Sequence, residues 1–341
     1  MRILMLADAR SFHTERFADE LRRQGCEVLI ASLEPGDTEH HRLKRRGRIS
    51  TVAYALARRE VEELLGSFRP DLISAHYAAG YGYLTSRVSY EGIPVTLHVW
   101  GSDVLVVPKR SWLHKRKVVA GLRAADHIFA DSHYLADAVR SLVSTDAVSV
   151  HPWGIERRHL GLHKQDYALS RPLTIIVPRL HEQIYDNLFI VEALREEIRA
   201  GLIQITFPSF GSLFHQFHSK ADELTVGRVQ YYEKLPRREF LAFMAAQDIY
   251  LSAARSDSSP VTLIEAMALG LIPVAADIPG VREWLTAETG FAYRPGDAAG
   301  LRGIVRSLAE AGDRYENMRR SNRVRVEQSA VFEDNVASQL V

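Results

Sequence analysis

Cysteine and long apolar runs are scarce in this chain of 341 residues, whose single cysteine is Cys26. One cysteine excludes an intramolecular disulfide framework and a zinc site built from several cysteines. No apolar run reaches the ~18 residues that cross a bilayer, and residues 1–10 lack the apolar core and cleavage site of a secretory signal. We therefore expect a soluble, cytoplasmic protein, with any membrane contact peripheral and at the inner face.

Three other features are missing: an excess of charge of one sign, a metal-binding motif and a glycine-rich fingerprint. The chain has 43 basic and 42 acidic residues and a formal net charge of +1, so nucleic-acid binding is not expected. It contains no Asp-x-Asp motif and no close cluster of His, Cys and carboxylate residues, so we expect no metal and no other cofactor. Residues 6–17 (LADARSFHTERF) lack the glycines of a nicotinamide-dependent dehydrogenase.

Apolar, β-branched runs alternate with helical stretches along most of the chain. A strand-like run at 2–7 is followed by a helical stretch at 15–24 and a second strand at 26–31. This order with short connections requires a right-handed crossover, so we predict an α/β fold with doubly wound parallel sheets. The other predicted strands are 71–76, 94–99, 127–132, 147–152, 173–179, 203–211, 229–235, 248–253 and 272–277, with helices at 117–126, 133–143, 187–200 and 237–246.

Two domains are expected because 341 residues exceed what one hydrophobic core usually serves. Residues 151–172 are rich in charge, Gly and Pro and lack sustained periodicity, which is typical of an interdomain connection. We place the domains at 1–160 and 161–320, followed by a helical tail at 321–341 that we expect to return toward the first domain. A cleft between the domains is then a natural place for a ligand.

Residues 255–270 (RSDSSPVTLIEAMALG) combine a polar loop after a strand with the start of a helix. Ser259 is a candidate N-cap and Gly270 suits the C-terminal cap. Such a helix presents the backbone N–H groups of Val261 and Thr262 at the carboxyl edge of the sheet. These groups and the helix dipole predict a site for an anion such as a diphosphate.

Two carboxylates, Asp257 and Glu265, lie on either side of this predicted anion site. Their spacing suits contact with opposite ends of a ligand whose phosphates lie between them, and a nucleotide sugar has that shape. The alternative is that Asp257 is a turn residue and Glu265 a capping or solvent-facing residue. The sequence of strand, loop, cap and helix favours the ligand site.

The segment resembles the donor motif of the retaining GT-B glycosyltransferases of family four, in which two glutamates flank seven residues; here Asp257 stands at the first position and Glu265 at the second. Residues 92–104, 123–139 and 269–297 also follow the order and spacing of that family. The resemblance implies a GT-B fold, in which two Rossmann-like domains face a central cleft, the first on the acceptor side and the second on the donor side. It also implies transfer of a hexose-type sugar from a nucleotide-diphosphate sugar, most commonly a UDP-sugar, to an acceptor hydroxyl with retention of configuration.

The same resemblance implies roles for the donor-side residues. Glu265 would bind the ribose hydroxyls and Asp257 the hydroxyls of the sugar. The amides of Val261 and Thr262 would bind the diphosphate, and backbone near Leu235 would contact the base.

A cation that neutralises the leaving diphosphate is a further element of the family. Arg179 matches it, but the family's lysine is missing from residues 181–187 (HEQIYDN). Because losing such a cation typically costs orders of magnitude in rate, we consider Arg255 as its replacement; a surface arginine before a turn is an equally good interpretation. In this family the departing phosphate itself is thought to take the acceptor's proton, which requires neither a separate base nor a metal.

The predicted acceptor side lies where the strands of the first domain end. Asp103 is the candidate for contact with the acceptor hydroxyl, and Trp100 stands where many relatives have a histidine. His98 shares a strand face with Trp100 and is a candidate substitute, although a buried structural histidine is equally consistent. The other residues assigned to this side are Ser11, His13 and His76.

Two dense basic runs, 40–48 and 109–117, belong to the first domain. The second interleaves Trp112 and Leu113 with five cations, so it is a candidate surface for an anionic bilayer that carries a lipid-linked acceptor. A solvated helix face is the alternative, and soluble sugars or small metabolites would then be the acceptors.

Departures from the family pattern leave other functions open. Asp257, the missing lysine and Trp100 are consistent with a degenerate GT-B module that binds a nucleotide sugar, or only a protein partner, without turnover. A GT-B epimerase or phosphorylase is a third interpretation, because a fold and an anion site do not define the reaction.

Overall fold

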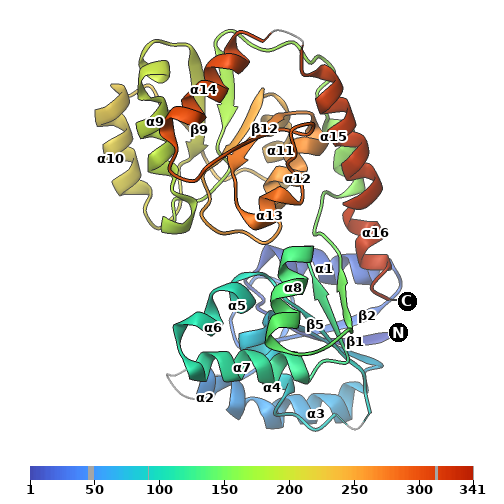
Figure 1. Ribbon diagram of the computed structural model, residues 1–341. Coiled ribbons are helices and arrows are strands. Elements are labelled where there is room, and N and C mark those ends of the chain that lie inside the picture. The colour runs from blue at the N-terminus through green and yellow to red at the C-terminus, as the bar shows by residue number, and fades with distance from the viewer. Residues whose placement is uncertain (45–49, 91, 312–313, 341) are drawn as a thin grey trace. The chain divides into compact units, whose positions relative to one another are not determined.

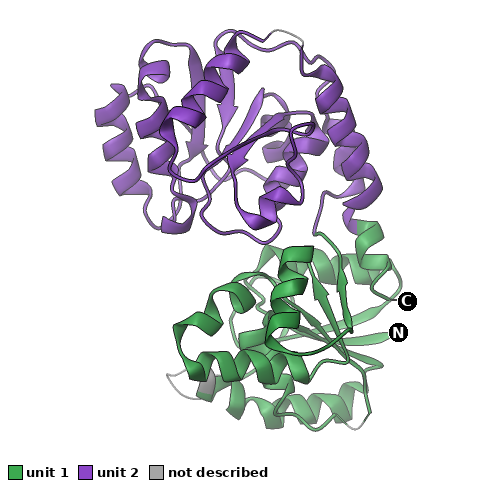
Figure 2. Ribbon diagram, viewed as in Figure 1, with its two compact units in different colours: residues 1–152, 333–341 green, residues 153–332 purple. Residues whose placement is uncertain are grey.

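The computed structural model describes residues 1–44, 50–90, 92–311 and 314–340 of the chain. The chain forms two compact units (Figure 2). Unit 1 comprises residues 1–152 and 333–341, and unit 2 comprises residues 153–332. The chain therefore passes from unit 1 into unit 2 after Pro152 and returns to unit 1 after Phe332.

Unit 1 is built on a parallel sheet of seven strands (Figure 1). The first strand lies inside the sheet, where Leu4 is flanked by Leu29 on one neighbour and Ile73 on the other. Each pairing in the sheet is parallel, as short strand-helix-strand connections require. The strand order is β3-β2-β1-β4-β5-β6-β7, with β1 (Arg2–Leu6), β2 (Glu27–Ser32), β3 (His41–Arg42), β4 (Leu72–His76), β5 (Val95–His98), β6 (His127–Ala130) and β7 (Val148–Val150).

The two faces of this sheet differ in chemistry. One face packs an apolar core against α3, α4, α7 and α8, which contribute residues such as Val61, Leu84 and Leu122. On the other face Phe17 of α1 packs edge-on against the rings of His76 and His98. The helices of unit 1 are α1 (Phe12–Arg23), α2 (Ser50–Leu56), α3 (Arg58–Phe68), the π-helix η1 (Tyr77–Gly82), α4 (Tyr83–Thr85), α5 (Ser102–Leu105), α6 (Val107–Arg110), α7 (Trp112–Arg123) and α8 (His133–Leu142), and α16 (Phe332–Ala337) follows the return from unit 2.

Unit 2 repeats the plan with a parallel sheet of six strands (Figure 1). The strand order is β10-β9-β8-β11-β12-β13, with β8 (Leu173–Ile176), β9 (Ile203–Pro208), β10 (Gln230–Tyr232), β11 (Ile249–Ser252), β12 (Ile272–Ala276) and β13 (Phe291–Tyr293). Its helices are the 3-10 helices η2 (Arg157–Leu162) and η3 (Gln183–Tyr185), and α9 (Asn187–Arg199), α10 (Phe214–Thr225), α11 (Arg237–Ala245), α12 (Val261–Leu269), α13 (Pro279–Arg282), α14 (Ala298–Ala309) and α15 (Glu316–Ser329).

The predicted class, α/β with two doubly wound parallel sheets, is confirmed. Helices α1 and α7 begin earlier than the periodicity predicts, because Ser11 and Ser111 cap them and accept hydrogen bonds from His13 and His114. Elements without a clear period, such as η1 and β3, were not predicted. Part of the basic run 40–48 lies outside the described residues.

None of the helices in the described part of the chain combines the length and the apolar character that a bilayer span requires.

Buried Arg319 of α15 is hydrogen-bonded to the C-terminal end of α12. Its side chain is 1% exposed, and it donates hydrogen bonds to the carbonyl oxygens of Gly270 (2.5 Å) and Tyr167 (2.7 Å). A cation at this end also complements the helix dipole. Gly270 adopts the left-handed conformation of the predicted C-terminal cap, so Arg319 holds α12 at the residue where it ends.

We predict that Arg319→Met lowers the free energy of unfolding by about 3 kcal/mol, because two buried carbonyl groups lose charged donors. Arg320→Met is the matched control: Arg320 is largely exposed and pairs with Glu316 on the same helix, so its loss should cost less than about 1 kcal/mol. Urea unfolding of both variants measures the difference. Equal losses would contradict the assigned role of Arg319.

Candidate active site

The segment after β11 forms a loop and then enters α12, as predicted. Residues 263–269 of this helix are buried, and the first intrahelical bond runs from Leu263 N to Pro260 O (2.9 Å). The N–H groups of Val261 and Thr262 precede that bond, so they lie at the open N-terminal turn. This turn has the features of an anion site.

The prediction that Ser259 caps this helix is wrong. Pro260 occupies the cap position, and no side chain donates or accepts a cap hydrogen bond there. Ser259 is buried, and its hydroxyl has no hydrogen-bond partner among the described residues. Because a serine side chain would compete with a ligand for the first N–H groups, its absence leaves the helix start to an anion.

Glu265 lies within α12 and is fully buried, with a side-chain exposure of 0%. Its carboxylate accepts hydrogen bonds from Arg237, at 3.3 Å between Nη1 and Oε2 and also from Nη2 to Oε1. Arg237 opens α11, directly after the loop that contains Leu235. A buried carboxylate stays charged only when it is paired, so Arg237 compensates the charge of Glu265.

Sequence reasoning did not single out Arg237. The signal available was weak: one basic residue that follows Pro236 at the start of a predicted helix. Nothing in the sequence relates it to Glu265, because 28 residues separate the two.

Arg179 and Asp257, which the sequence places far apart, form an ion pair in the structure. Arg179 follows β8, and its guanidinium lies over the ring of Tyr185, 5.0 Å from the ring centre. Burial alone would lower the pKa of Arg179, but Asp257, Tyr250 and Tyr185 raise it above its ordinary value, so the group is cationic. Its Nε is buried and has no hydrogen-bond partner in the described part of the chain.

Arg255 lies next to the stretch from which the family's lysine is missing. Its backbone N–H donates to Ile184 O (2.8 Å), and its guanidinium pairs with Asp186 (2.6 Å). The side chain is 67% exposed. The structure thus places this cation beside the expected position but pairs it with Asp186, which belongs to the stretch that lacks the lysine.

Gly280 of α13 supports the loop ahead of α12. A Cβ atom at Gly280 would overlap the carbonyl oxygens of Ser258 and Asp257. The close approach of the two backbones requires glycine here. The loop that carries Asp257 is therefore held by backbone packing as well as by Arg179.

Asp103 is fully buried in unit 1, where it connects the start of η1 with the loop after β5. Its carboxylate accepts hydrogen bonds from the backbone N–H groups of Ala78 (2.7 Å) and Trp100 (3.0 Å). Burial raises the pKa of Asp103 to about 6, although these and other backbone N–H groups lower it. The contacts make Asp103 a positioning residue, and its burial does not favour the predicted contact with an acceptor hydroxyl.

His76 and His98 stack on one another at the ends of β4 and β5, with 4.3 Å between ring centres. Burial and the neighbouring His98 hold the pKa of His76 well below its ordinary value. Burial, together with His151 and His127, lowers the pKa of His98 to about 3. Both rings are therefore neutral at physiological pH, which excludes them as cations for a phosphate.

Trp100 and His13 complete this cluster at the carboxyl edge of the sheet. The indole of Trp100 lies edge-on to His76 and His13, with 5.8 Å between ring centres in each pair. Ser11 precedes them and caps α1. The structure thus brings together Ser11, His13, His76, His98 and Trp100, the residues predicted for the acceptor side.

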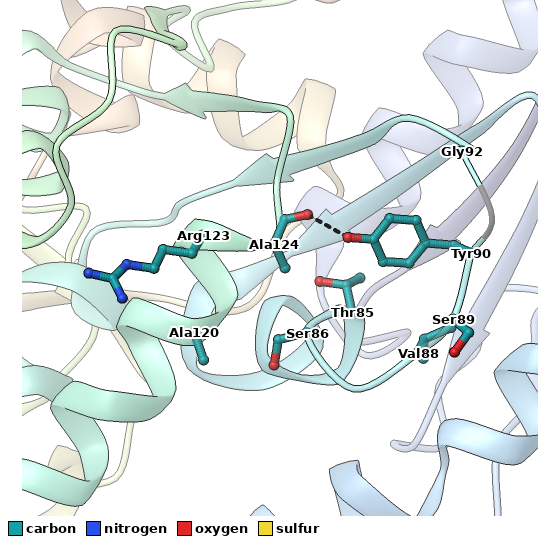
Figure 3. A pocket seen from close by; sticks show the side chains of 9 residues that line it. All are labelled: Thr85, Ser86, Val88, Ser89, Tyr90, Gly92, Ala120, Arg123 and Ala124. Carbon is teal, nitrogen blue, oxygen red and sulfur yellow. Dashed lines mark hydrogen bonds between the residues drawn. The ribbon is translucent and has the colours of Figure 1, made fainter.

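A cavity of about 480 Å³ lies elsewhere in unit 1, between the end of α7 and the connection from α4 to β5 (Figure 3). Tyr90 lines it and donates its hydroxyl to Ala124 O (3.1 Å), and Arg123 supplies a positive charge. Because α7 ends and β5 begins there, the cavity is at the amino edge of the sheet. It is separate from the residues predicted for the acceptor side.

Comparison with known families matches both parts of the chain. The family described as Glycosyl transferase 4-like matches residues 2–132, and Glycosyl transferases group 1 matches residues 200–325. The two matches together cover well over half of the chain.

Curated relatives match about three quarters of the chain. TuaC of Bacillus subtilis (strain 168), whose name assigns it as a glycosyltransferase of teichuronic acid biosynthesis, is 27% identical over 265 residues, 73% of this chain and 62% of that protein. The N-acetyl-alpha-D-glucosaminyl L-malate synthase of Bacillus anthracis is 23% identical over 73% of this chain and 68% of its own length. The chain thus spans less than two thirds of the TuaC protein.

Solved structures match the whole chain in fold. Anabaena Alr3699/HepE in complex with UDP superposes with a TM-score of 0.82 at 16% identity, over 100% of this chain and 99% of that one. The same protein has been solved with UDP-glucose. The sucrose-phosphate synthase of Thermosynechococcus elongatus gives a TM-score of 0.81 at 16% identity, over 99% and 97% of the two chains.

We predict that Asp103 makes stability depend on pH. Its pKa of about 6 exceeds the ordinary value of 3.8, so the folded protein holds this proton more tightly than the unfolded chain. The stabilisation is complete below pH ~4 and is lost as pH rises through ~6. Relative to Asp103→Asn, the wild type should therefore lose about 2–3 kcal/mol of free energy of unfolding from pH 4 to pH 7. Urea unfolding of both proteins at the two pH values measures this loss. A difference that is constant with pH would refute this.

Proposed function

The chain belongs to the group 1 glycosyltransferases of family four and has the GT-B fold, and from this premise we propose that it transfers a hexose-type sugar from a UDP-sugar to an acceptor hydroxyl with retention of anomeric configuration. The observation that carries the proposal is the open N-terminus of α12, with Arg179, whose side chain is 11% exposed, paired to the loop ahead of it. UDP as the nucleotide is supported by the UDP and UDP-glucose bound to Anabaena HepE.

Each part of the donor has a proposed partner in unit 2. The diphosphate binds the N–H groups of Val261 and Thr262, where the helix dipole favours negative charge. The ribose hydroxyls bind Glu265, and the base lies against the loop at Leu235. Asp257 takes the sugar hydroxyls.

Arg179 is the proposed cation for the leaving diphosphate. A guanidinium has five N–H donors, and Asp257 occupies only part of them. The Nε, which has no partner within the described residues, leaves Arg179 able to bind a phosphate oxygen while it keeps Asp257. Support for Arg255 is weaker, because its side chain is 67% exposed and both its Nε and its Nη2 already donate to Asp186.

The proposed transfer breaks the bond between the anomeric carbon and the diphosphate oxygen, and forms a bond from the acceptor oxygen on the same face of the sugar. The proton of the acceptor hydroxyl passes to the departing phosphate, so charge does not accumulate on the protein. His76 and His98 are too weakly basic to take that proton, given their lowered pKa values. Arg179 and the α12 N-terminus stabilise the diphosphate as it leaves. We propose that no metal takes part.

Asp103, His98, Ser11, His13, His76 and Trp100 form the proposed acceptor side. The ring of Trp100 is partly exposed and offers an uncharged surface on which an acceptor sugar can stack, with the buried, neutral ring of His76 packed edge-on behind it. Asp103 acts there by holding the backbone of Ala78 and Trp100 in place.

We further propose that the acceptor is presented at an anionic bilayer. Trp112 and Leu113 at the start of α7 are 65% and 57% exposed, and Lys109, Arg110 and Lys115 around them are exposed too. The connection from the end of β5 through α5 and α6 leads directly into this surface, so it belongs to the predicted acceptor edge of unit 1. Apolar side chains among cations are typical of surfaces that rest on anionic lipid.

We predict that UDP-sugars stabilise the wild type against heat and that Glu265→Ala weakens their binding by about 10- to 100-fold, since a charged acceptor is lost. At a concentration of 100 times Kd the true donor should add about 2.7 kcal/mol of stability. Glu192→Ala, an exposed glutamate on α9, is the control. Thermal shift, with product analysis in EDTA, is the measurement.

The outcomes of this screen separate the candidate functions. Sugar transfer that persists in EDTA, with retained configuration, supports the proposal. Stabilisation without any product would show a binding module. A wild type that no nucleotide sugar stabilises would overturn the donor site altogether.

We predict that the protein co-sediments with vesicles containing phosphatidylglycerol at low salt, and that Trp112→Ser combined with Leu113→Ser reduces binding about tenfold or more, because two exposed apolar side chains are lost. Salt should weaken the binding. Leu202→Ser in unit 2, also an exposed leucine, is the control. Vesicle binding unchanged by the double substitution would show that another surface is used.

A further inference from the structure

The most deeply buried charged contact of the donor side joins Glu265 to Arg237. Glu265 is 0% exposed, whereas the Arg237 side chain is 23% exposed. Arg237 thus contacts the buried carboxylate while part of its own side chain stays exposed. Arg237 belongs to a different helix, α11, which begins directly after the loop at Leu235. Its contact with Glu265 therefore connects that loop to α12.

The geometry of the pair leaves part of the carboxylate available. Arg237 Nη1 donates to Oε2 at 3.3 Å, and Nη2 donates to Oε1. A carboxylate has about four lone-pair sites, two on each oxygen. The fork of Arg237 takes one site on each oxygen, so one site on each stays for another donor.

Two hydroxyl groups on neighbouring carbons can donate to the two lone-pair sites of Glu265 that Arg237 does not use. The 2′ and 3′ hydroxyls of a ribose are such a pair, and each can donate to one oxygen of Glu265. Deoxyribose has only one of them. Discrimination between the two sugars then depends on how firmly Glu265 is held in its charged, two-oxygen arrangement.

We propose that Arg237 is a positioning residue that holds Glu265 ionised and oriented for both ribose hydroxyls, and that it thereby makes the donor site selective for ribonucleotides over 2′-deoxyribonucleotides. The inference rests on the proposed function, in which Glu265 binds the ribose. Without Arg237, a buried and unpaired carboxylate takes up a proton or turns away, and either change removes one acceptor.

The position of Arg237 explains why an arginine is suited to this task. Pro236 is the cap residue of α11 and Arg237 is its first residue, two positions after Leu235. The base-contacting loop and the ribose contact are therefore linked within a few residues of chain. A lysine at this position would offer a point charge and not the planar fork that both oxygens require.

The test measures the affinity of UDP and of 2′-deoxy-UDP by calorimetry. The readout is the ratio of the two Kd values, which does not depend on the fraction of folded protein. For the wild type we expect 2′-deoxy-UDP to bind at least about tenfold more weakly, since one charged hydrogen bond is lost. In Arg237→Met we expect the ratio to fall below about threefold, with UDP itself bound more weakly. Arg237→Lys should lie between, because it keeps the charge without the fork.

Two further variants show whether Arg237 acts through Glu265. Glu265→Gln should lower the ratio on its own, and adding Arg237→Met to it should lower the ratio no further, as expected of residues that act as a unit. Arg238→Met is the matched control, because Arg238 is the exposed neighbour of Arg237 on the same helix. Its ratio should equal that of the wild type.

The outcomes that overturn the inference differ from those that overturn the function. If Arg237→Met and Arg237→Lys keep the wild-type ratio, the inference is wrong although the donor site stands. If Glu265→Gln keeps the ratio, ribose is read elsewhere and the inference is equally wrong. If the wild type binds no UDP, the proposed function itself fails, and the inference fails with it.

Discussion

The pairing of each donor-segment carboxylate with an arginine is the interaction on which the proposed donor site in unit 2 depends. Residues 263–269 of α12 are buried, so a charged Glu265 is tolerated there only because Arg237 reaches it. Asp257 likewise compensates Arg179 beside the start of the same helix. With these charges balanced, the helix can present its N-terminal amides to a ligand without an unpaired charge beneath them. An anion at this site then interacts with the helix dipole and with the N–H group of Arg179 Nε.

Unit 1 brings a different chemistry to its sheet edge. Burial keeps His76 and His98 neutral. Both carboxylate oxygens of Asp103 accept hydrogen bonds from backbone N–H groups. The rings around Trp100 are therefore uncharged, and the buried carboxylate of Asp103 faces backbone N–H groups. An edge of this kind suits a neutral sugar acceptor, and it agrees with a reaction in which the departing phosphate takes the proton.

Sequence periodicity predicted the parallel sheets because buried strands and their helices have strong local signals. The anion site at α12 was also predictable, since a strand, a polar loop and an apolar helix follow one another in the chain. The partners of the two carboxylates were not, because 78 residues separate Arg179 from Asp257 and local patterns do not encode such pairs. The Ser259 cap failed for a related reason: a serine before proline is a good cap by type, yet packing buries its hydroxyl.

A crystal structure of the protein with UDP bound tests the proposed donor site most directly. We expect both ribose hydroxyls to lie within ~3 Å of the Glu265 carboxylate, which remains paired with Arg237. We also expect phosphate oxygens to accept hydrogen bonds from the amides of Val261 and Thr262 and from Arg179. UDP bound away from α12, with Glu265 contacting only Arg237, would contradict the central claim that this helix and its paired carboxylates form the donor site.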